Sequence, residues 1–100
     1  MKEIEFHWDP EKDQINQSKH NGISFDEAKT VFYDENARLI FDPDHSMNEE
    51  RFIIIGLSQK LRLLVVCHCY KDSDSIIRLI SARKASAKEE LVYEGHRNAK

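Results

Sequence analysis

Two arginines stand at the closing end of the most apolar part of this chain, and their chemistry suits a phosphate ligand. The run Ile-Ile-Arg-Leu-Ile at residues 76–80 is typical of a buried strand, yet it holds Arg78 and leads to Ser81, Arg83 and Lys84. A guanidinium is permanently charged, and its planar fork matches the oxygens of a phosphate. It also stabilises charge that develops on a phosphorus centre. We therefore predict phosphate binding for Arg78 and Arg83, with pairing to the acidic residues of the first half of the chain as the structural alternative.

A histidine on the preceding predicted strand adds acid–base chemistry. Histidine titrates near neutral pH, so His68 can take a proton from a ribose 2′-hydroxyl or give one to a departing 5′-oxygen. With the arginines it completes the set that a metal-free ribonuclease needs, and use of the 2′-hydroxyl would make such an enzyme selective for RNA. Arg78 and Arg83 have opposite parity along a strand. Only one of them shares a face with His68, unless Ser81-Ala82 hosts a bulge or the strand ends there.

The predicted strand at residues 61–70 has two unlike sides. One side carries Leu61, Leu63, Val65, Cys67 and Cys69, and the other carries Arg62, Leu64, Val66, His68 and Tyr70. The first side is wholly apolar, so we predict that it lies beneath the N-terminal helices. The second becomes polar toward its end, so we predict that His68 and Tyr70 lie on a partly open face.

The composition is that of a single globular domain over residues 1–100. Apolar residues make up 40% of the chain and charged residues 33%. No apolar stretch approaches the ~20 residues of a membrane span, and we expect no signal peptide and no membrane partner. Cys67 and Cys69 are two apart on a predicted strand, a spacing unsuited to a disulfide between them. Reduced thiols favour a cytoplasmic location.

The net charge of −3 conceals two unlike halves. Residues 1–50 hold five Lys and Arg against thirteen Asp and Glu, whereas residues 51–100 hold ten against five. A basic half can serve a phosphate-bearing partner even in an acidic protein. The second half is therefore where we expect a nucleic acid to bind.

Periodicity and capping signals predict an α+β fold. A strand at residues 4–8 is followed by a helix that Asp9-Pro10-Glu11 starts and that ends near residue 20. Ser24 with Glu27 forms a capping box for a second helix, which ends near residue 34. Strands follow at residues 39–41, 51–57, 61–70 and 76–82, and Ser86 with Glu89 caps a helix to about residue 93. Short connections favour hairpins. We predict an antiparallel sheet with two N-terminal helices and one C-terminal helix, in the order β-α-α-β-β-β-β-α.

Many short segments together resemble the BrnT toxin family. In the first half they are Phe6-His7-Trp8-Asp9-Pro10-Glu11-Lys12, Asn16, Lys19-His20, Gly22, Ser24-Phe25, Glu27-Ala28, Val31-Phe32, Asp44-His45 and Glu49-Glu50. In the second half they are Arg51, Ile55-Gly56, residues 63–68, Arg78-Leu79-Ile80-Ser81-Ala82-Arg83-Lys84-Ala85, Glu89 and Tyr93. The resemblance spans residues 6–93. The family usually places Gly directly after the Lys-His pair, whereas this chain has Asn21, so we expect a longer helix-ending turn.

The resemblance implies a RelE-like ribonuclease toxin of a type II toxin–antitoxin system. It implies a ribbon-helix-helix antitoxin, similar to BrnA, that covers the toxin and alone contacts operator DNA. Separately, the uncovered surface of the toxin could allow a homodimer, and the sequence leaves the oligomeric state open. Carried over residue by residue, the catalytic candidates are Arg51, His68, Arg78, Arg83 and His45, and the substrate-binding candidates are Lys19, His20, Lys84 and Glu50. No cofactor is expected.

Other classes of function stay open on the sequence. The histidines and cysteines lack the spacing of a zinc site, so we expect no metal. A binding module could use the basic half to hold nucleic acid or an acidic partner without cleaving it. A degenerate toxin would fold and bind its antitoxin but remain inactive. Growth arrest on induction, rescued by the antitoxin, would distinguish an active ribonuclease toxin from the binding module and from the degenerate toxin.

Overall fold

The N-terminal part of the chain folds as its capping residues predict. The computed structural model describes residues 3–42 and 49–98, and begins with strand β1 (Glu5–His7) and helix α1 (Pro10–Lys19). Asp9 caps α1, and its carboxylate accepts the Glu11 N–H at 2.9 Å. Beyond the C-cap residue His20, Asn21 has φ +52° and Gly22 φ +74°, and the Gly22 N–H bonds to a carbonyl of the last turn. The helix-ending turn thus contains a left-handed Asn before its Gly.

The second predicted helix is two elements. Helix α2 (Phe25–Thr30) begins at Ser24, whose Oγ accepts the Glu27 N–H at 3.1 Å, and a 3-10 helix, η1 (Val31–Tyr33), follows it. Gly56 lies beneath η1, and a Cβ there would come within 2.9 Å of Val31. The lack of a side chain on Gly56 therefore leaves room for η1 against the sheet, and the element order differs from the predicted one by η1.

The sheet is mixed, which corrects the prediction of a purely antiparallel one. Its strands lie in the order β1-β5-β4-β3-β2, with β2 (Arg38–Asp42), β3 (Arg51–Leu57), β4 (Leu63–Lys71) and β5 (Ile76–Lys84). These four form antiparallel pairs, but β1 runs parallel to β5. In the chain β1 and β5 are separated by α1, α2, η1 and the other three strands, a connection long enough for a parallel pair. The RelE-like character stays a prediction.

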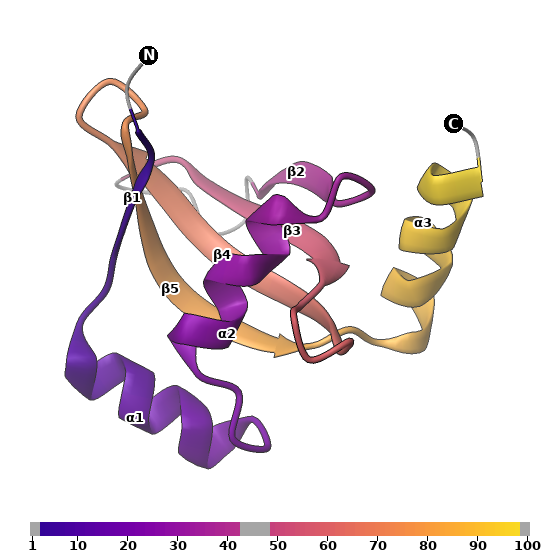
Figure 1. Ribbon diagram of the computed structural model, residues 1–100, viewed down its shortest axis with the longest axis horizontal. Helices are drawn as coiled ribbons and strands as arrows, with labels where there is room; N and C mark the ends of the chain where they lie inside the picture. Colours follow the sequence, from indigo (N-terminus) through magenta and orange to yellow (C-terminus); the bar gives the residue numbers. More distant parts are fainter. Residues whose placement is uncertain (1–2, 43–48, 99–100) are drawn as a thin grey trace.

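The helices cover the side of β4 that we predicted to be open, so our face assignment was wrong. Leu64, Val66 and the fully buried His68 lie on the helix side, where the core also contains Ile23, Phe25, Ala28, Val31, Ile77, Leu79 and Ala82. Figure 1 shows α2 crossing this face of the sheet. The opposite side is partly apolar because a second cluster forms there from Ile55, Val65, Ala85 and Tyr93. Both sides of β4 are packed, so the alternation of its side chains did not show which side the helices cover.

The C-terminal helix α3 (Ala87–Asn98) closes the second cluster. Ser86 and Glu89 form the predicted capping box: Ser86 N–H donates to Glu89 at 2.8 Å, and Glu89 N–H donates to Ser86 Oγ at 3.2 Å. The hydroxyl of Tyr93 donates to Asp34 Oδ2 at 2.8 Å, which ties α3 to the segment after η1. None of the helices in the described ranges is long and apolar enough to cross a membrane.

Candidate functional site

A β-bulge in β5 brings the two arginines to one face of the sheet. Cys67 pairs with Ser81 and His68 with Leu79, so Ile80 is an extra residue in β5. As a result Arg78, opposite Cys69, and Arg83, opposite Val65, both point away from α1 and α2. Neither shares a face with His68. The sequence left open a bulge at Ser81-Ala82, and the structure has the bulge one residue earlier, at Ile80.

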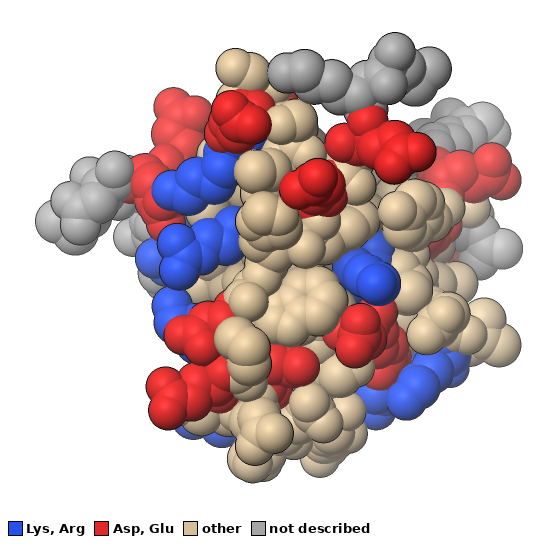
Figure 2. Space-filling model, turned by 60° about the vertical axis from the view of Figure 1, so that its left-hand side comes forward, with Lys and Arg blue, Asp and Glu red and all other residues tan. Residues whose placement is uncertain are grey.

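Two further cations join the arginines on what we call the basic face, defined by Arg51, Lys71, Arg78 and Arg83. Lys71 alternates with Cys67 and Cys69 along β4, and Arg51 lies two residues before Ile53, the partner of Cys67. Figure 2 shows Lys and Arg side chains gathered along the left edge of the molecule, on the side that faces away from α2 in Figure 1. The basic half predicted from composition therefore includes a local basic surface.

Arg83 is held by a carboxylate from α3. Its two Nη atoms donate to the two oxygens of Glu89 at 2.7 and 2.8 Å, a bidentate pair. Arg83 and the capping bonds of Ser86 lower the pKa of Glu89 to about 2. Beside this pair is a cavity of about 270 Å³, lined by Asp42, Arg51, Ile53, Val65, Cys67, Ile80, Ser81 and Arg83. Burial raises the pKa of the Cys67 thiol, which disfavours its reactive thiolate.

Glu49 lies among the other cations of the basic face. Its carboxylate accepts from Lys71 Nζ at 2.7 Å and is 4.0 Å from Arg51 Nη2. The bond from Lys71 lowers the pKa of Glu49, and the nearby charges of Arg51 and Arg78 add to this effect. Cations on this face therefore already hold carboxylate oxygens, which resemble phosphate oxygens in geometry and charge.

His7 is a candidate residue that our sequence reasoning missed. It lines a cavity of about 400 Å³ with Trp8, Asp9, Lys71, Ile76 and Arg78. Its Cα partner across the β1–β5 pair is Arg78, so both side chains lie on the basic face. The signal was present in the alternation of Glu5, Phe6 and His7, which predicts that Glu5 and His7 point away from the core.

His68, by contrast, is a core residue, fully buried against Phe32 with ring centroids 4.8 Å apart. Its Nδ1 bonds to the Val66 carbonyl at 3.0 Å and must donate there, so Nε2 accepts from the Tyr70 hydroxyl at 3.2 Å. Burial lowers the pKa of His68 to about 4, which keeps the ring neutral. A neutral histidine enclosed in this way cannot touch RNA unless its neighbours move.

The remaining predicted residues do not converge on the basic face. Lys19 and His20 end α1 in the helix layer, and Lys84 pairs with Leu64 on the helix side of the sheet. Glu50 borders a different hollow, described next. His45 lies outside the described residues. Of the predicted residues, the structure brings together Arg51, Arg78 and Arg83.

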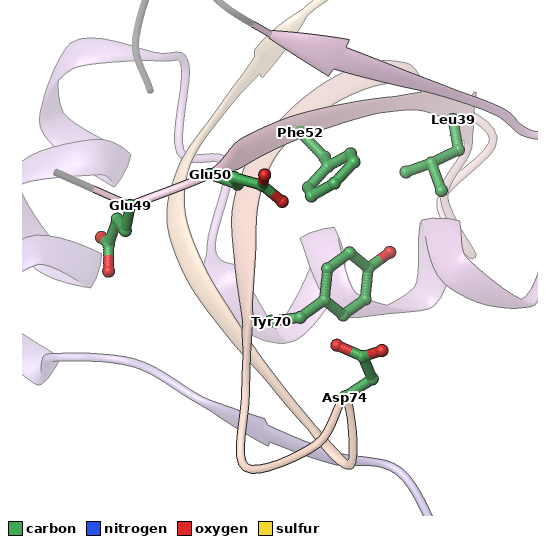
Figure 3. Close-up of a pocket in the computed structure, with 6 residues that line it drawn as sticks. All are labelled: Leu39, Glu49, Glu50, Phe52, Tyr70 and Asp74. Carbon is green, nitrogen blue, oxygen red and sulfur yellow. The ribbon is translucent and has the colours of Figure 1, made fainter. Parts of the chain in front are cut away.

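The hollow beside Glu50 lies on the helix side of the sheet and is aromatic with an acidic rim. Its volume is about 520 Å³, and its lining residues are Leu39, Glu49, Glu50, Phe52, Tyr70 and Asp74. Figure 3 shows Tyr70 between Phe52 and Asp74, with the Glu49 carboxylate pointing elsewhere. Tyr70 also lines a neighbouring hollow with Glu3, Ile4, Phe6, Phe32, Tyr33 and Ile77. We call these two hollows the aromatic surface.

A metal site is not part of either surface as far as the structure describes them. Among residues 3–42 and 49–98 no group of three or more His, Cys, Asp or Glu side chains is arranged to hold a metal ion. The chemistry available on the basic face is that of guanidinium, ammonium, imidazole and carboxylate groups.

Comparisons with known proteins identify a matching family and a similar solved structure. A family model described as a ribonuclease toxin, BrnT, of a type II toxin–antitoxin system matches residues 8–89. The crystal structure of the Brucella abortus ribonuclease toxin BrnT is similar, with a TM-score of 0.61 and 25% identity over 83% of this chain and 97% of that chain. A search of curated proteins gave no match.

These findings first define a class: the protein is a toxin of a type II toxin–antitoxin system. More closely, the chain belongs to the BrnT family of ribonuclease toxins. Membership of a type II system implies an antitoxin partner.

Proposed function

We propose that this protein is an endoribonuclease that binds RNA on the basic face and cleaves it by metal-independent acid–base chemistry. The observation that carries the proposal is the bulge at Ile80, which places Arg78 and Arg83 on the same face as Arg51 and Lys71. Four cations on one sheet face can follow a phosphate backbone, and a family of ribonuclease toxins supplies the substrate class.

The arginines would act through charge and geometry. Arg83 emerges from a strand and is oriented by Glu89, so its fork loses little freedom when a phosphate replaces the carboxylate. Arg78 and Lys71 line one cavity, where two cations can hold the oxygens of a single phosphodiester. Such donors stabilise the extra negative charge of the transition state more than the substrate.

Single substitutions test this proposal. We expect Arg78→Ala and Arg83→Ala each to lower RNA cleavage about 10²–10³-fold, because each removes a donor to the phosphate. Cleavage of an RNA oligonucleotide by purified protein, with EDTA present, is the measurement. Lys29→Ala, which removes a cation from the helix layer, is the matched control. Variants that fold and still cleave at the normal rate, or wild-type cleavage that requires added Mg²⁺, would contradict the proposal.

A second function is favoured by one specific observation. Arg83 donates to both carboxylate oxygens of Glu89, and Lys71 donates to Glu49, so each of these two cations already has a partner within the protein. A non-catalytic module that binds nucleic acid or an acidic protein would show the same arrangement. RNA that is bound but recovered intact would identify this function.

For the antitoxin, we propose a ribbon-helix-helix protein that docks on the aromatic surface. Leu39 and Phe41 are 52% and 47% exposed there, beside the partly buried rings of Phe52 and Tyr70. Glu50 and Asp74 border the same hollow, and their charge would repel RNA. The surface therefore fits an amphipathic protein segment that carries Lys or Arg beside its apolar residues.

A further inference from the structure

His7 lies beside Arg78 on the basic face, where the proposed ribonuclease chemistry requires a proton acceptor. A ribonuclease without metal must remove the proton of the 2′-hydroxyl that attacks the phosphorus. The structure describes the side chains of His7, His20 and His68. His68 is enclosed in the core and His20 ends α1, whereas His7 lies beside Arg78.

The carboxylate of Glu5 is the hydrogen-bond partner of His7. The Nε2 atom of His7 is 3.1 Å from Glu5 Oε2, and both residues point to the same side of β1. A carboxylate accepts hydrogen bonds, so Nε2 carries the proton and Nδ1 of the neutral ring keeps its lone pair. A carboxylate that holds a histidine in this way sets up the other nitrogen as a base.

The surroundings of His7 suit a bound phosphodiester. Arg78 of β5 and Lys71 of β4 line the same cavity of about 400 Å³, and Asp9 caps α1 at its border. The charged groups around the imidazole are thus Glu5, Asp9, Arg78 and Lys71, the last of which is bonded to Glu49. A phosphate held by the two cations would bring its ribose into reach of a side chain that is half exposed.

We infer that His7 is the general base of this site and that Glu5 is its positioning residue, an assignment that rests on the proposed ribonuclease function. His7 takes the proton of the 2′-hydroxyl while the 2′-oxygen forms a bond to phosphorus. The bond from phosphorus to the 5′-oxygen breaks, and the leaving oxygen takes a proton from water. The resulting hydroxide removes the proton from the imidazolium. The products are a 2′,3′-cyclic phosphate and a 5′-hydroxyl end.

The test is His7→Ala, assayed with a single-stranded RNA oligonucleotide. We expect the kcat of cleavage to fall about 10²-fold or more with KM little changed, because the base acts on the reaction rather than on binding. Added imidazole should restore part of the rate in His7→Ala and leave the wild-type rate unaltered. A structural role for His7 would not produce this rescue.

Two outcomes separate this inference from the proposed function. If His7→Ala cleaves at the wild-type rate while Arg78→Ala does not, His7 is not the base and the ribonuclease assignment stands. If the wild-type protein binds RNA and leaves it intact at every pH, the proposed function fails and the role of His7 fails with it. Product ends other than 2′,3′-cyclic phosphate and 5′-hydroxyl would overturn the reaction written above.

Discussion

At the scale of single residues, this protein separates the histidine and the arginines that seemed to belong together. His68 is neutral and buried, with both ring nitrogens hydrogen-bonded inside the core. Arg83 and Lys71 are partly exposed and paired with carboxylates at the surface. Although these residues lie on two neighbouring strands, His68 is in the core, whereas Arg83 and Lys71 are on a surface that a polyanion could contact.

The burial of His68 predicts a pH dependence of stability. The pKa of His68 falls from 6.5 to about 4 on folding, so between these values the unfolded chain binds a proton that the folded chain does not. The free energy of unfolding should therefore decrease as the pH falls below 6.5, by about 3 kcal/mol at pH 4 from this residue.

Urea unfolding at several pH values measures this effect. A His68→Gln variant, less stable overall, should show a shallower decrease between pH 6.5 and 4 because it cannot take up the proton. Parallel pH profiles for the two proteins would show that acid destabilisation comes from other groups.

At the scale of elements, short irregularities decide which side chains meet. One extra residue, Ile80, reverses the direction of the side chains beyond it and so aligns Arg83 with Arg78. A second local feature, a salt bridge, connects the turn between β3 and β4 to α2. Arg62 donates to both oxygens of the buried Glu27, which also accepts from Ser58 Oγ at 2.6 Å.

Removal of Arg62 should destabilise the fold without affecting chemistry. The carboxylate of Glu27 is buried, and Arg62 lowers its pKa, so Arg62→Ala leaves an uncompensated charge in the core. We expect a loss of about 3 kcal/mol in the free energy of unfolding. Urea denaturation is the measurement, and Lys88→Ala, which removes an exposed cation on α3, is the control. Equal effects of the two substitutions would show that the Glu27–Arg62 contact contributes little.

At the scale of the whole molecule, RNA and antitoxin would use different surfaces. The basic face lies on one side of the sheet, and the aromatic surface with Glu50 and Asp74 lies on the other. An antitoxin on the aromatic surface would leave part of the basic face uncovered. Inhibition would then require it to extend around the edge of the sheet or to hold the toxin in an inactive form.

Substitutions on opposite sides of the molecule test where the antitoxin binds. Leu39→Asp places a charge in the aromatic surface and should weaken the complex at least about 30-fold, the effect of losing an apolar anchor of about 2 kcal/mol or more. Leu91→Asp, on α3, is the control because Leu91 is 74% exposed away from the hollow. Affinity for the co-purified antitoxin can be measured by calorimetry. If Leu91→Asp alone lost binding, the antitoxin would contact α3 rather than the aromatic surface.

Local signals in the sequence were sufficient for most elements of this fold. Asp9, Ser24 and Ser86 cap helices where predicted, because a cap needs only a side-chain oxygen and the next few N–H groups. The strand at residues 51–57 was predicted with its observed bounds. Leu61 was wrongly included in β4, because its left-handed conformation (φ +60°) places it in the turn before that strand.

The sequence also contained the chemistry of the basic face, since Arg51, Arg78 and Arg83 were among its predicted site residues. It could not decide which side of β4 the helices cover, because Val65 and Val66 are equally apolar and both sides are packed. It could not place His68 in the core or His7 beside Arg78 either. Those placements depend on the pairing of β1 with β5 and on the bulge at Ile80, which are contacts between strands far apart in the chain. Residue types and helix caps depend on neighbouring residues and can be read from the sequence. Contacts between side chains far apart in the sequence depend on how the strands pair, which is decided only when the sheet forms.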